Sequence, residues 1–423
     1  MPQGFNGNLP PPSRGFYLGI MIQLELFDHT DRTRLSEDLF SAYFDCRKNK
    51  RNTLNALKFE KHLERNVFEL IDEIYLGTYN PGKSIAFVVT KPVKREVFAA
   101  DFRDRVVHHW LINKLNPLFE NWFIQNSYAC REGKGTHYGI QQADHFIKEC
   151  SENYTKPCYL LKLDIQGFFM HINRKTLYTR LTQFINEHYR ENDKGLVLEI
   201  TRKIIFNQPT QHCIIKGRKA DWEGLPKNKS LFHSPPDCGL PIGNLTSQVF
   251  ANFYLHPLDI FITEDLGINY YGRYVDDFII VHCDKDYLKS LIGKISNFLH
   301  STLQLTLHPK KIYLQEYNKG LKFLGTVIKP NRIYIGNRTK GNFYLAIQQQ
   351  NKLIEHRTPQ KEDYAHFISS MNAYLGIMKH YKTYKIRKKM IHNLLNPTWW
   401  KHMSIHRCYS KFKRIKKIRN KIR

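Results

Sequence analysis

Apolar residues follow helical spacing at both ends of the chain and strand-like spacing in its middle. From Arg34 to Tyr75 they recur at helical spacing, and beyond Lys340 this pattern returns, with one apolar stripe from Tyr364 to Met378. Between these regions, SIAFVVTKPVKREVFAA (residues 84 to 100) predicts two strands around a basic, proline-containing turn. Strands in the middle and helices at the ends predict a protein of the α+β class.

Three further segments complete the predicted middle of the chain. Residues 102 to 119 have helical spacing, and Pro117 is expected to close this helix. CYLLKLDIQGFF (158 to 169) predicts a buried strand that runs into the start of a helix. YYGRYVDDFIIVH (270 to 282) predicts two short strands that meet at an aspartate pair, and a helix from Lys285 to Leu303 follows.

Composition indicates a folded protein that binds a polyanion. The 423 residues allow two or three domains, and 42% hydrophobic residues suffice for a sizeable core. Lysine and arginine number 65 against 38 acidic residues, and the net charge of +27 favours nucleic acid over an acidic membrane as the partner. No stretch approaches the roughly 20 apolar residues that a membrane-spanning helix needs.

The remaining global signals favour a cytoplasmic location. The N-terminus lacks the basic start and the unbroken apolar core of a signal peptide. The eight cysteines form no C-x-x-C pair, and none lies beside a histidine at zinc-site spacing. We therefore expect reduced thiols in a cytosolic protein.

Three aspartates interrupt segments that are otherwise apolar. Asp276 and Asp277 lie between two predicted strands, and Asp164 ends the apolar run CYLLKL. Neighbouring side chains of a strand point to opposite faces, so the pair can approach one ligand only at a hairpin tip. If Asp164 ends a neighbouring strand, three carboxylates converge there. The alternative is structural, with an Asx-type turn at the pair and Asp164 as a helix cap.

Convergent carboxylates would have a defined chemistry. They repel one another and take up protons unless divalent cations compensate their charge, and ligation by oxygen alone favours Mg²⁺ over Zn²⁺. Two Mg²⁺ ions about 4 Å apart can activate a 3′-hydroxyl and stabilise a leaving pyrophosphate. The predicted reaction is therefore nucleotidyl transfer.

The segments around these aspartates resemble the reverse transcriptase family. YVDD (274 to 277) is similar to its Y-x-D-D box, and LKLDIQGFF to the segment of its first catalytic aspartate. The resemblance extends from roughly Ser84 to Ile335. It implies an RNA-directed DNA polymerase that uses two Mg²⁺ ions, with Mn²⁺ able to substitute. The metal ligands that it implies are Asp164, Asp276, Asp277 and the backbone carbonyl of Ile165.

The resemblance also implies a right-hand polymerase with fingers, an antiparallel-sheet palm and a helical thumb. The expected segments are an N-terminal extension (1–33), the fingers (34–155), the palm (156–338, with a connecting insertion at about 187–238), the thumb (339–400) and a basic C-terminal tail (401–423).

Further family segments imply residues that bind the nucleotide. In KPVKREVFAADFRDRVV, Arg95 with Lys91 or Lys94 would meet the triphosphate, although a solvated basic turn is the alternative. Phe169 would exclude a 2′-hydroxyl and so select dNTPs, unless it is only a core aromatic. The remaining substrate-binding residues that the resemblance implies are Ile242, Gly243, Gln248 and Tyr274.

Other segments imply contacts with nucleic acid. SYACREGKGTHYG is similar to a fingers block in which Arg131 and Lys134 would approach template phosphates, and a plain glycine-rich loop is the alternative. HPKKIYL and KFLGTVI resemble late palm blocks. They imply that Lys311 acts near the leaving group and that Phe323, Leu324 and Gly325 grip the primer.

One stretch favours a particular branch of the family. GLPIGNLTSQVFANFYLHPLD (239 to 259), with LPKNKSLF before it, resembles the reverse transcriptases of diversity-generating retroelements. Mutagenic retrohoming by these systems copies a template-repeat RNA with misincorporation opposite adenine. Most reverse transcriptases have glutamine at the position of Ile242, and an isoleucine can pack but cannot hydrogen-bond the nascent pair. An ordinary apolar role for Ile242 is the alternative.

Two rival functions stay open at this stage. One is a phage-defence or retron-type reverse transcriptase, and the other is a noncatalytic RNA-binding scaffold. His171 departs from the small hydroxyl residue expected of the family at this position. The implied partners are a template RNA, an RNA/DNA hybrid, dNTPs and a basic accessory protein, in the cytoplasm of a bacterial or phage-infected cell.

Overall fold

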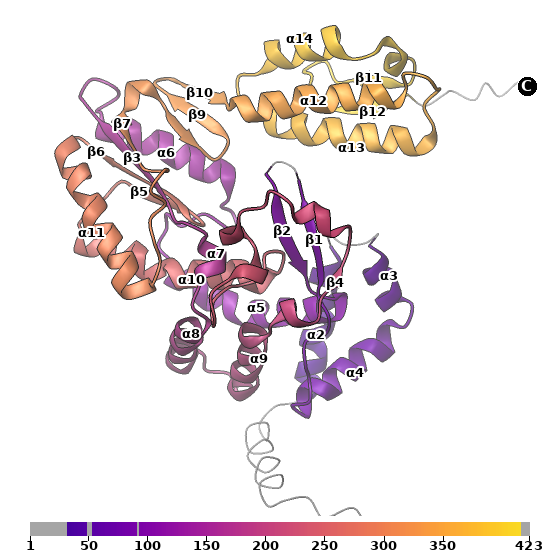
Figure 1. Ribbon diagram of the computed structural model, residues 1–423, viewed down its shortest axis with the longest axis vertical. Helices are drawn as coiled ribbons and strands as arrows, with labels where there is room; N and C mark the ends of the chain where they lie inside the picture. Colours follow the sequence, from indigo (N-terminus) through magenta and orange to yellow (C-terminus); the bar gives the residue numbers. More distant parts are fainter. Residues whose placement is uncertain (1–31, 49–52, 91–92, 416–423) are drawn as a thin grey trace, which may run out of the picture. The chain divides into compact units, whose positions relative to one another are not determined.

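The structure, a computed structural model, describes residues 32–48, 53–90 and 93–415 (Figure 1). Lys91, most of the expected N-terminal extension and the end of the basic tail lie outside the described residues. The chain divides into two compact units. The first unit comprises residues up to Arg131, Asp164–Gly267 and Lys294–Pro309, and the second unit comprises Glu132–Leu163, Ile268–Gly293 and the chain from Lys310 onward.

The first unit combines helices with one small sheet. Its sheet has the strand order β2-β1-β4, with β1 and β2 antiparallel and β4 parallel to β1. The strands are β1 (Ile85–Val89), β2 (Arg95–Ala99) and β4 (Ile214–Ile215). The helices are α2 (Arg32–Arg47), α3 (Leu54–Glu60), α4 (Leu63–Tyr75), α5 (Phe102–Trp122), α7 (Phe168–His171), α8 (Arg174–His188), α9 (Lys194–Phe206) and α10 (Leu245–Ile260).

Short helical turns complete the first unit. They are η1 (Pro209–Gln211), η2 (Lys219–Trp222), η3 (Lys227–Lys229), η4 (Leu231–His233) and the π-helical η5 (Phe261–Asp265). The two strands predicted around the basic turn are confirmed as β1 and β2. The stretch before Gly239 is a series of turns, because Gly and Pro interrupt it repeatedly.

Helix α5 is longer than its sequence suggested. The expectation that Pro117 closes it was wrong, since the helix runs through Pro117 to Trp122. Leu115 and Phe119, which are both fully buried, flank the proline, and α5 packs against α2 and α10. The apolar packing on both sides of the proline thus offsets the loss of the backbone hydrogen bond that proline cannot donate.

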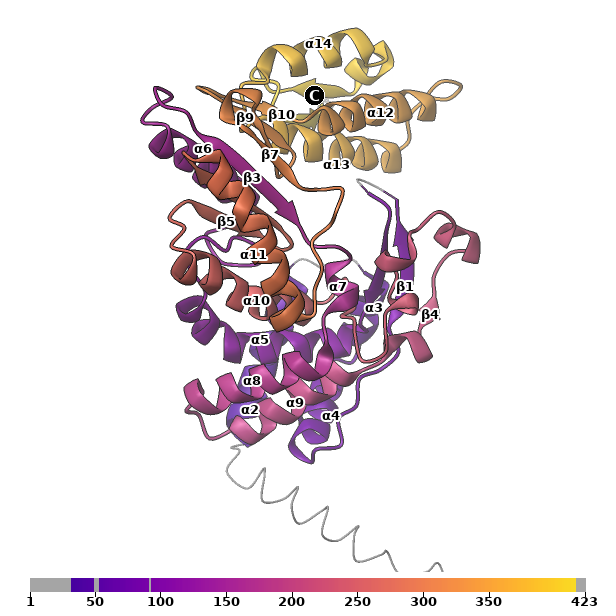
Figure 2. The ribbon, with the colours of Figure 1, turned by 60° about the vertical axis from the view of Figure 1, so that its left-hand side comes forward.

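The second unit contains a four-stranded sheet in the order β5-β6-β3-β7, with all four strands labelled in Figure 1 and β3, β5 and β7 seen from another side in Figure 2. Its strands are β3 (Tyr159–Asp164), β5 (Tyr271–Tyr274), β6 (Asp277–His282) and β7 (Tyr313–Glu316). Helix α6 (Thr136–Cys150) packs against β5 and β6. Helix α11 (Lys285–Leu303) follows β6 and has the predicted bounds, and its residues from Lys294 onward belong to the first unit. A second sheet has three strands in the order β10-β9-β8. They are β8 (Leu321–Phe323), β9 (Thr326–Lys329) and β10 (Arg332–Ile335); the short turn η6 (Tyr317–Lys319) precedes β8, and the C-terminal helices follow β10.

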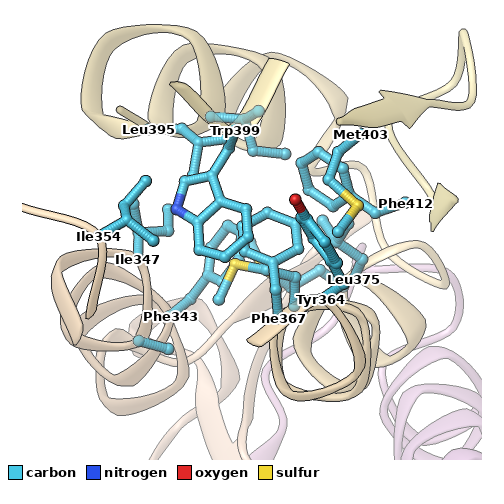
Figure 3. Packing of buried hydrophobic residues seen from close by; sticks show 14 of the residues in the cluster. Phe343, Ile347, Ile354, Tyr364, Phe367, Leu375, Leu395, Trp399, Met403 and Phe412 are labelled. Atoms are coloured by element: carbon cyan, nitrogen blue, oxygen red, sulfur yellow. The ribbon is translucent and has the colours of Figure 1, made fainter. Parts of the chain in front are cut away.

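The C-terminal part of the second unit has its own apolar core. Trp399 is fully buried there and stacks on Phe367 with ring centroids 4.3 Å apart (Figure 3). The predicted stripe from Tyr364 to Met378 is confirmed as the buried face of α13. The elements around this core are α12 (Asn337–Leu353), α13 (Lys361–Met378), α14 (Tyr384–Leu394), η7 (Pro397–Lys401), β11 (Met403–Ile405) and β12 (Phe412–Arg414).

The start of the expected basic tail belongs to this folded core. Strands β11 and β12 form an antiparallel pair. Met403 and Phe412 are each 1% exposed, because they pack into the core that contains Trp399. Within the described residues, no helix has both the length and the apolarity needed to cross a membrane.

Candidate active site

The aspartate pair lies at the tip of a β-hairpin, as its sequence predicted. Strands β5 and β6 pair antiparallel with Tyr274 opposite Asp277, so Val275 and Asp276 form a two-residue turn. Val275 has φ +58°, in the left-handed region that β-branched residues rarely adopt. Both carboxylates are partly exposed at this tip.

Backbone strain at Val275 gives a stability prediction. Replacing Val275 with asparagine, which tolerates the left-handed region, should raise the free energy of unfolding by about 1 kcal/mol. The measurement is urea unfolding of the two proteins. Val327→Asn, at a β9 position of ordinary strand geometry, is the control and should not be stabilising. If Val275→Asn instead lowered the free energy of unfolding, the packing of the valine side chain would stabilise the fold by more than the strained backbone destabilises it.

A buried arginine supports the hairpin from within. Arg273 on β5 is 0% exposed, and its guanidinium donates a hydrogen bond to the carbonyl of Val275 (3.0 Å). A guanidinium is costly to bury, so its hydrogen bonds must be made to strong acceptors. Arg273 therefore fixes the backbone of the turn that carries Asp276.

A lysine on the neighbouring strand pairs with the second aspartate. Lys162 Nζ lies 3.0 Å from Asp277 Oδ2, and β3 is adjacent to β6 in the sheet. The ammonium also lies 6.0 Å from the centroid of the Phe323 ring. The ammonium of Lys162 thus places a positive charge beside the Asp277 carboxylate at the start of β6.

Asp164 ends the same strand two residues later. Lys162 and Asp164 are partly exposed whereas Leu161 and Leu163 are buried, so the alternation of the strand puts the lysine and Asp164 on one face. Beyond the strand, the carbonyl of Asp164 accepts a hydrogen bond from His308 N (2.8 Å), and Ile165 pairs with Leu307. The division between the two units falls between Leu163 and Asp164.

The first unit brings several predicted nucleotide-binding residues together. Phe169 and Ile242 pack in one apolar cluster with Phe98 and Leu231. Phe98 N donates to the carbonyl of Ile242 (2.8 Å). The backbone of Gly243 has φ +127°, and an added Cβ would lie 2.8 Å from Val97 Cγ1, so this close approach requires glycine.

The basic residues predicted for the triphosphate lie at the start of β2. Arg95 is exposed, and Lys94 Nζ donates to the carbonyl of Glu223 (2.5 Å). Gln248 is exposed on α10. The Cys130 thiol donates a hydrogen bond to Gln248 Oε1 (2.9 Å), and desolvation raises the pKa of this thiol.

Arg131 lies in internal contacts rather than on a surface. Its guanidinium donates to Glu120 Oε2 (2.9 Å) and to the carbonyls of Ile124 (2.6 Å) and Ser127 (3.2 Å), and its side chain is 4% exposed. Lys134 in the same loop lies 6.0 Å from the Tyr138 ring centroid. Protein groups therefore hold the Arg131 guanidinium, and its contact with template phosphates stays a prediction.

The remaining predicted residues belong to the second unit. Tyr274 and Lys311 are partly exposed there. Phe323 is buried, and the two residues after it, Leu324 (φ +46°) and Gly325 (φ +81°), form the tight turn between β8 and β9. The carbonyl of Gly325 accepts a hydrogen bond from Gly336 N (2.8 Å).

Sequence reasoning missed three charged residues of these regions. Lys162 and Arg273 each interrupt an apolar strand, which is the same signal that identified the aspartates. Glu96 on β2 is 2% exposed and accepts three hydrogen bonds. Its sequence context, a basic turn, gave no sign that it would be buried.

Comparison with known proteins shows which protein family the chain matches. Residues 94–328 match the family described as reverse transcriptase (RNA-dependent DNA polymerase). Protein YkfC of Escherichia coli (strain K12) is 21% identical over an alignment of 306 residues, and the match covers 64% of this chain and 73% of that protein.

Solved telomerase structures are also similar in part. An apo telomerase from Candida tropicalis, truncated from its C-terminal domain, is 15% identical and matches 60% of this chain and 55% of that one, with a TM-score of 0.44. A telomerase from Candida albicans in complex with a TWJ fragment of telomeric RNA is 12% identical and matches 74% and 56%, with a TM-score of 0.43. The chain spans little more than half the length of these two structures.

Proposed function

Because the chain belongs to the reverse transcriptase (RNA-dependent DNA polymerase) family, we propose that it copies a template-repeat RNA into cDNA with misincorporation opposite adenine, within a diversity-generating retroelement. Membership of the family makes it an RNA-directed DNA polymerase that binds a nucleic-acid template and dNTPs. The template-repeat RNA and the adenine-directed errors are the proposal.

The structural elements support a right-hand assignment within this proposal. The hairpin β1–β2 and its neighbouring helices would be the fingers, and the sheet β5-β6-β3-β7 would be the palm. Helices α12 to α14 would form the thumb, with β11 and β12 as part of it. A thumb of this kind would recognise an RNA/DNA hybrid mainly by the sugar–phosphate backbone and the shape of the hybrid.

Asp164, Asp276 and Asp277 are the proposed metal ligands, with the backbone carbonyl of Ile165. The donor set fits a hard divalent cation, since every donor is an oxygen. Within the part of the chain that the structure describes, no group of three or more His, Cys, Asp or Glu side chains is arranged to hold a metal ion. The strand order supports the assignment, because β3 ends at Asp164 and its neighbour β6 begins at Asp277.

Other residues would bind and orient the substrates. Two Mg²⁺ ions, with Mn²⁺ able to substitute, would activate the primer 3′-hydroxyl and stabilise the leaving pyrophosphate. Arg95 and Lys94 would bind the triphosphate, and Lys311 would hold a positive charge near the leaving group. Phe169 would exclude a 2′-hydroxyl by steric contact. Lys162 Nζ, 3.0 Å from Asp277 Oδ2, keeps that carboxylate oriented.

The observation that carries the retroelement assignment is the apolar character of the wall around Ile242. The Ile242 side chain packs against the buried cluster that contains Phe98 and Leu231, as Phe169 does, and a hydrocarbon side chain cannot hydrogen-bond a base pair. An apolar surface that makes only packing contacts discriminates weakly between base pairs of similar shape. The basic accessory protein expected of such systems belongs to the same proposal.

Replacing Ile242 with glutamine tests this assignment. The new amide can hydrogen-bond the nascent pair, so misincorporation opposite template adenine should fall about threefold to tenfold. The measurement is primer extension on an adenine-containing RNA with Mg²⁺, followed by sequencing of the cDNA. Ile242→Leu keeps an apolar wall and should leave the error frequency unchanged.

An unchanged error spectrum in Ile242→Gln would contradict the role of this wall. Accurate copying of adenine by the unaltered protein would instead favour a retron-type or phage-defence reverse transcriptase.

A further inference from the structure

Residues 214–239, here called the brace, join the β1–β2 hairpin to the corner that carries Phe169. On the hairpin side, β4 continues the sheet, with Ile214 N donating to the carbonyl of Ser84 (2.8 Å). Lys94 Nζ donates to the carbonyl of Glu223 (2.5 Å), farther along the brace. The hairpin is therefore attached to the brace along its edge and near its turn.

A buried carboxylate makes the densest of these attachments. Glu96 accepts hydrogen bonds from Trp222 Nε1 (2.7 Å) and Ser230 Oγ (2.8 Å) through Oε1, and from Leu231 N (2.5 Å) through Oε2. All three donors belong to the brace, and Glu96 is 2% exposed. Hydrogen bonds to a buried charged group are strong, and losing them leaves both sides unsatisfied.

The other side of the brace contacts the corner that begins with Gly167 and contains α7. Gly167 has φ +56°, and an added Cβ would lie 2.7 Å from the carbonyl oxygen of Asn228. Gly239 N donates to the carbonyl of Ile172 (2.9 Å), and the next residue, Leu240, donates to the carbonyl of Phe169 (2.8 Å). The brace therefore touches the corner before and after α7.

Neighbouring residues on β2 connect these contacts to the proposed nucleotide pocket. Side chains alternate along a strand, so Glu96 and Phe98 share one face of β2 while Arg95 lies on the other. Phe98 belongs to the buried cluster against which Phe169 and Ile242 pack, and its backbone nitrogen donates a hydrogen bond to the carbonyl of Ile242. Holding Glu96 thus also sets the position of the strand that presents Arg95.

We propose that the brace preforms the nucleotide pocket by fixing the β1–β2 hairpin against the corner that carries Phe169, with Glu96 as the positioning residue. This inference rests on the proposed function, since it assigns Arg95, Phe169 and Ile242 to dNTP binding. A pocket that must close on its ligand lets the binding energy of the correct nucleotide drive assembly, which adds specificity. A preformed pocket lacks this step and accepts matched and mismatched nucleotides alike.

Glu96→Gln tests the proposal by steady-state primer extension. Glutamine has one acceptor oxygen and turns an NH₂ group toward brace donors, so the hairpin loses its fixed position. The KM for the matched dNTP should rise about tenfold, and that for a mismatched dNTP at least as much, with kcat within about twofold. The affinity for primer–template, which the pocket does not determine, should not change.

Matched controls separate positioning from stability. Glu199→Gln removes a carboxylate that pairs with Arg202 (2.7 Å) on the surface of α9, and it should leave the KM unchanged. Trp222→Phe and Ser230→Ala each remove one donor to Glu96 and should give smaller rises in KM. If Glu96→Gln does not fold, the KM values of Trp222→Phe and Ser230→Ala test the positioning role of Glu96.

Unchanged KM values in these variants, with only a lower melting temperature, would overturn the positioning role. Failure of the retroelement proposal is distinguishable, because it would appear as accurate copying of adenine by the unaltered protein. A rise in the KM of Glu96→Gln would support the brace in either case.

Discussion

Replacing Asp277 with asparagine should reduce primer extension by at least about a thousandfold. The amide keeps the shape of the side chain but removes the charge that a divalent cation requires, and such cations contribute several kcal/mol to stabilising the transition state. Asp277 is partly exposed at the hairpin tip, so the fold should tolerate the change. The measurement is extension of a DNA primer on an RNA template with Mg²⁺.

Two controls isolate the carboxylate. Asp286→Asn changes an exposed aspartate in the first turn of α11 and should leave the rate within about twofold of the unaltered protein. Lys162→Met removes the ion pair with Asp277 (3.0 Å) but keeps the carboxylate, so it should cost far less than Asp277→Asn. Equal losses in Lys162→Met and Asp277→Asn would assign the effect to the ion pair rather than to metal ligation.

Replacing Arg273 with methionine should lower the free energy of unfolding by about 2–3 kcal/mol. Methionine fills much of the buried space but cannot donate to the carbonyl of Val275 (3.0 Å), which then lacks that partner at a strained turn. The measurement is urea unfolding followed by circular dichroism. Polymerisation should fall as well, since the turn carries Asp276.

An exposed arginine provides the comparison for Arg273. Arg202→Met removes a surface ion pair with Glu199, and exposed pairs of this kind contribute only about 0.2–1 kcal/mol. If Arg202→Met were as destabilising as Arg273→Met, the support of the hairpin by Arg273 would be disproved.

Local sequence patterns predicted the elements whose cause is local. The hairpin at Asp276 follows from two short apolar runs separated by a polar pair, and the bounds of α11 follow from uninterrupted helical spacing. The buried face of α13 follows from its apolar stripe in the same way. A charge that interrupts an apolar run marked Asp164, which the structure places at the end of β3; its catalytic role stays a prediction.

Features that depend on distant partners were not predictable. Helix α5 continues through Pro117 because α2 and α10 pack against it. The sequence next to the proline does not predict those contacts. Arg131 lies in a glycine-rich basic loop, yet its guanidinium is held by Glu120 and by backbone carbonyls. Glu96 is buried because donors more than a hundred residues later in the chain converge on it.

The activity that we propose for this chain is RNA-templated DNA synthesis with adenine-directed errors. The most direct test is primer extension by the unaltered protein on an adenine-containing RNA with Mg²⁺, with sequencing of every product. We predict cDNA whose errors concentrate opposite template adenines. Products without excess errors at adenine would contradict the claim.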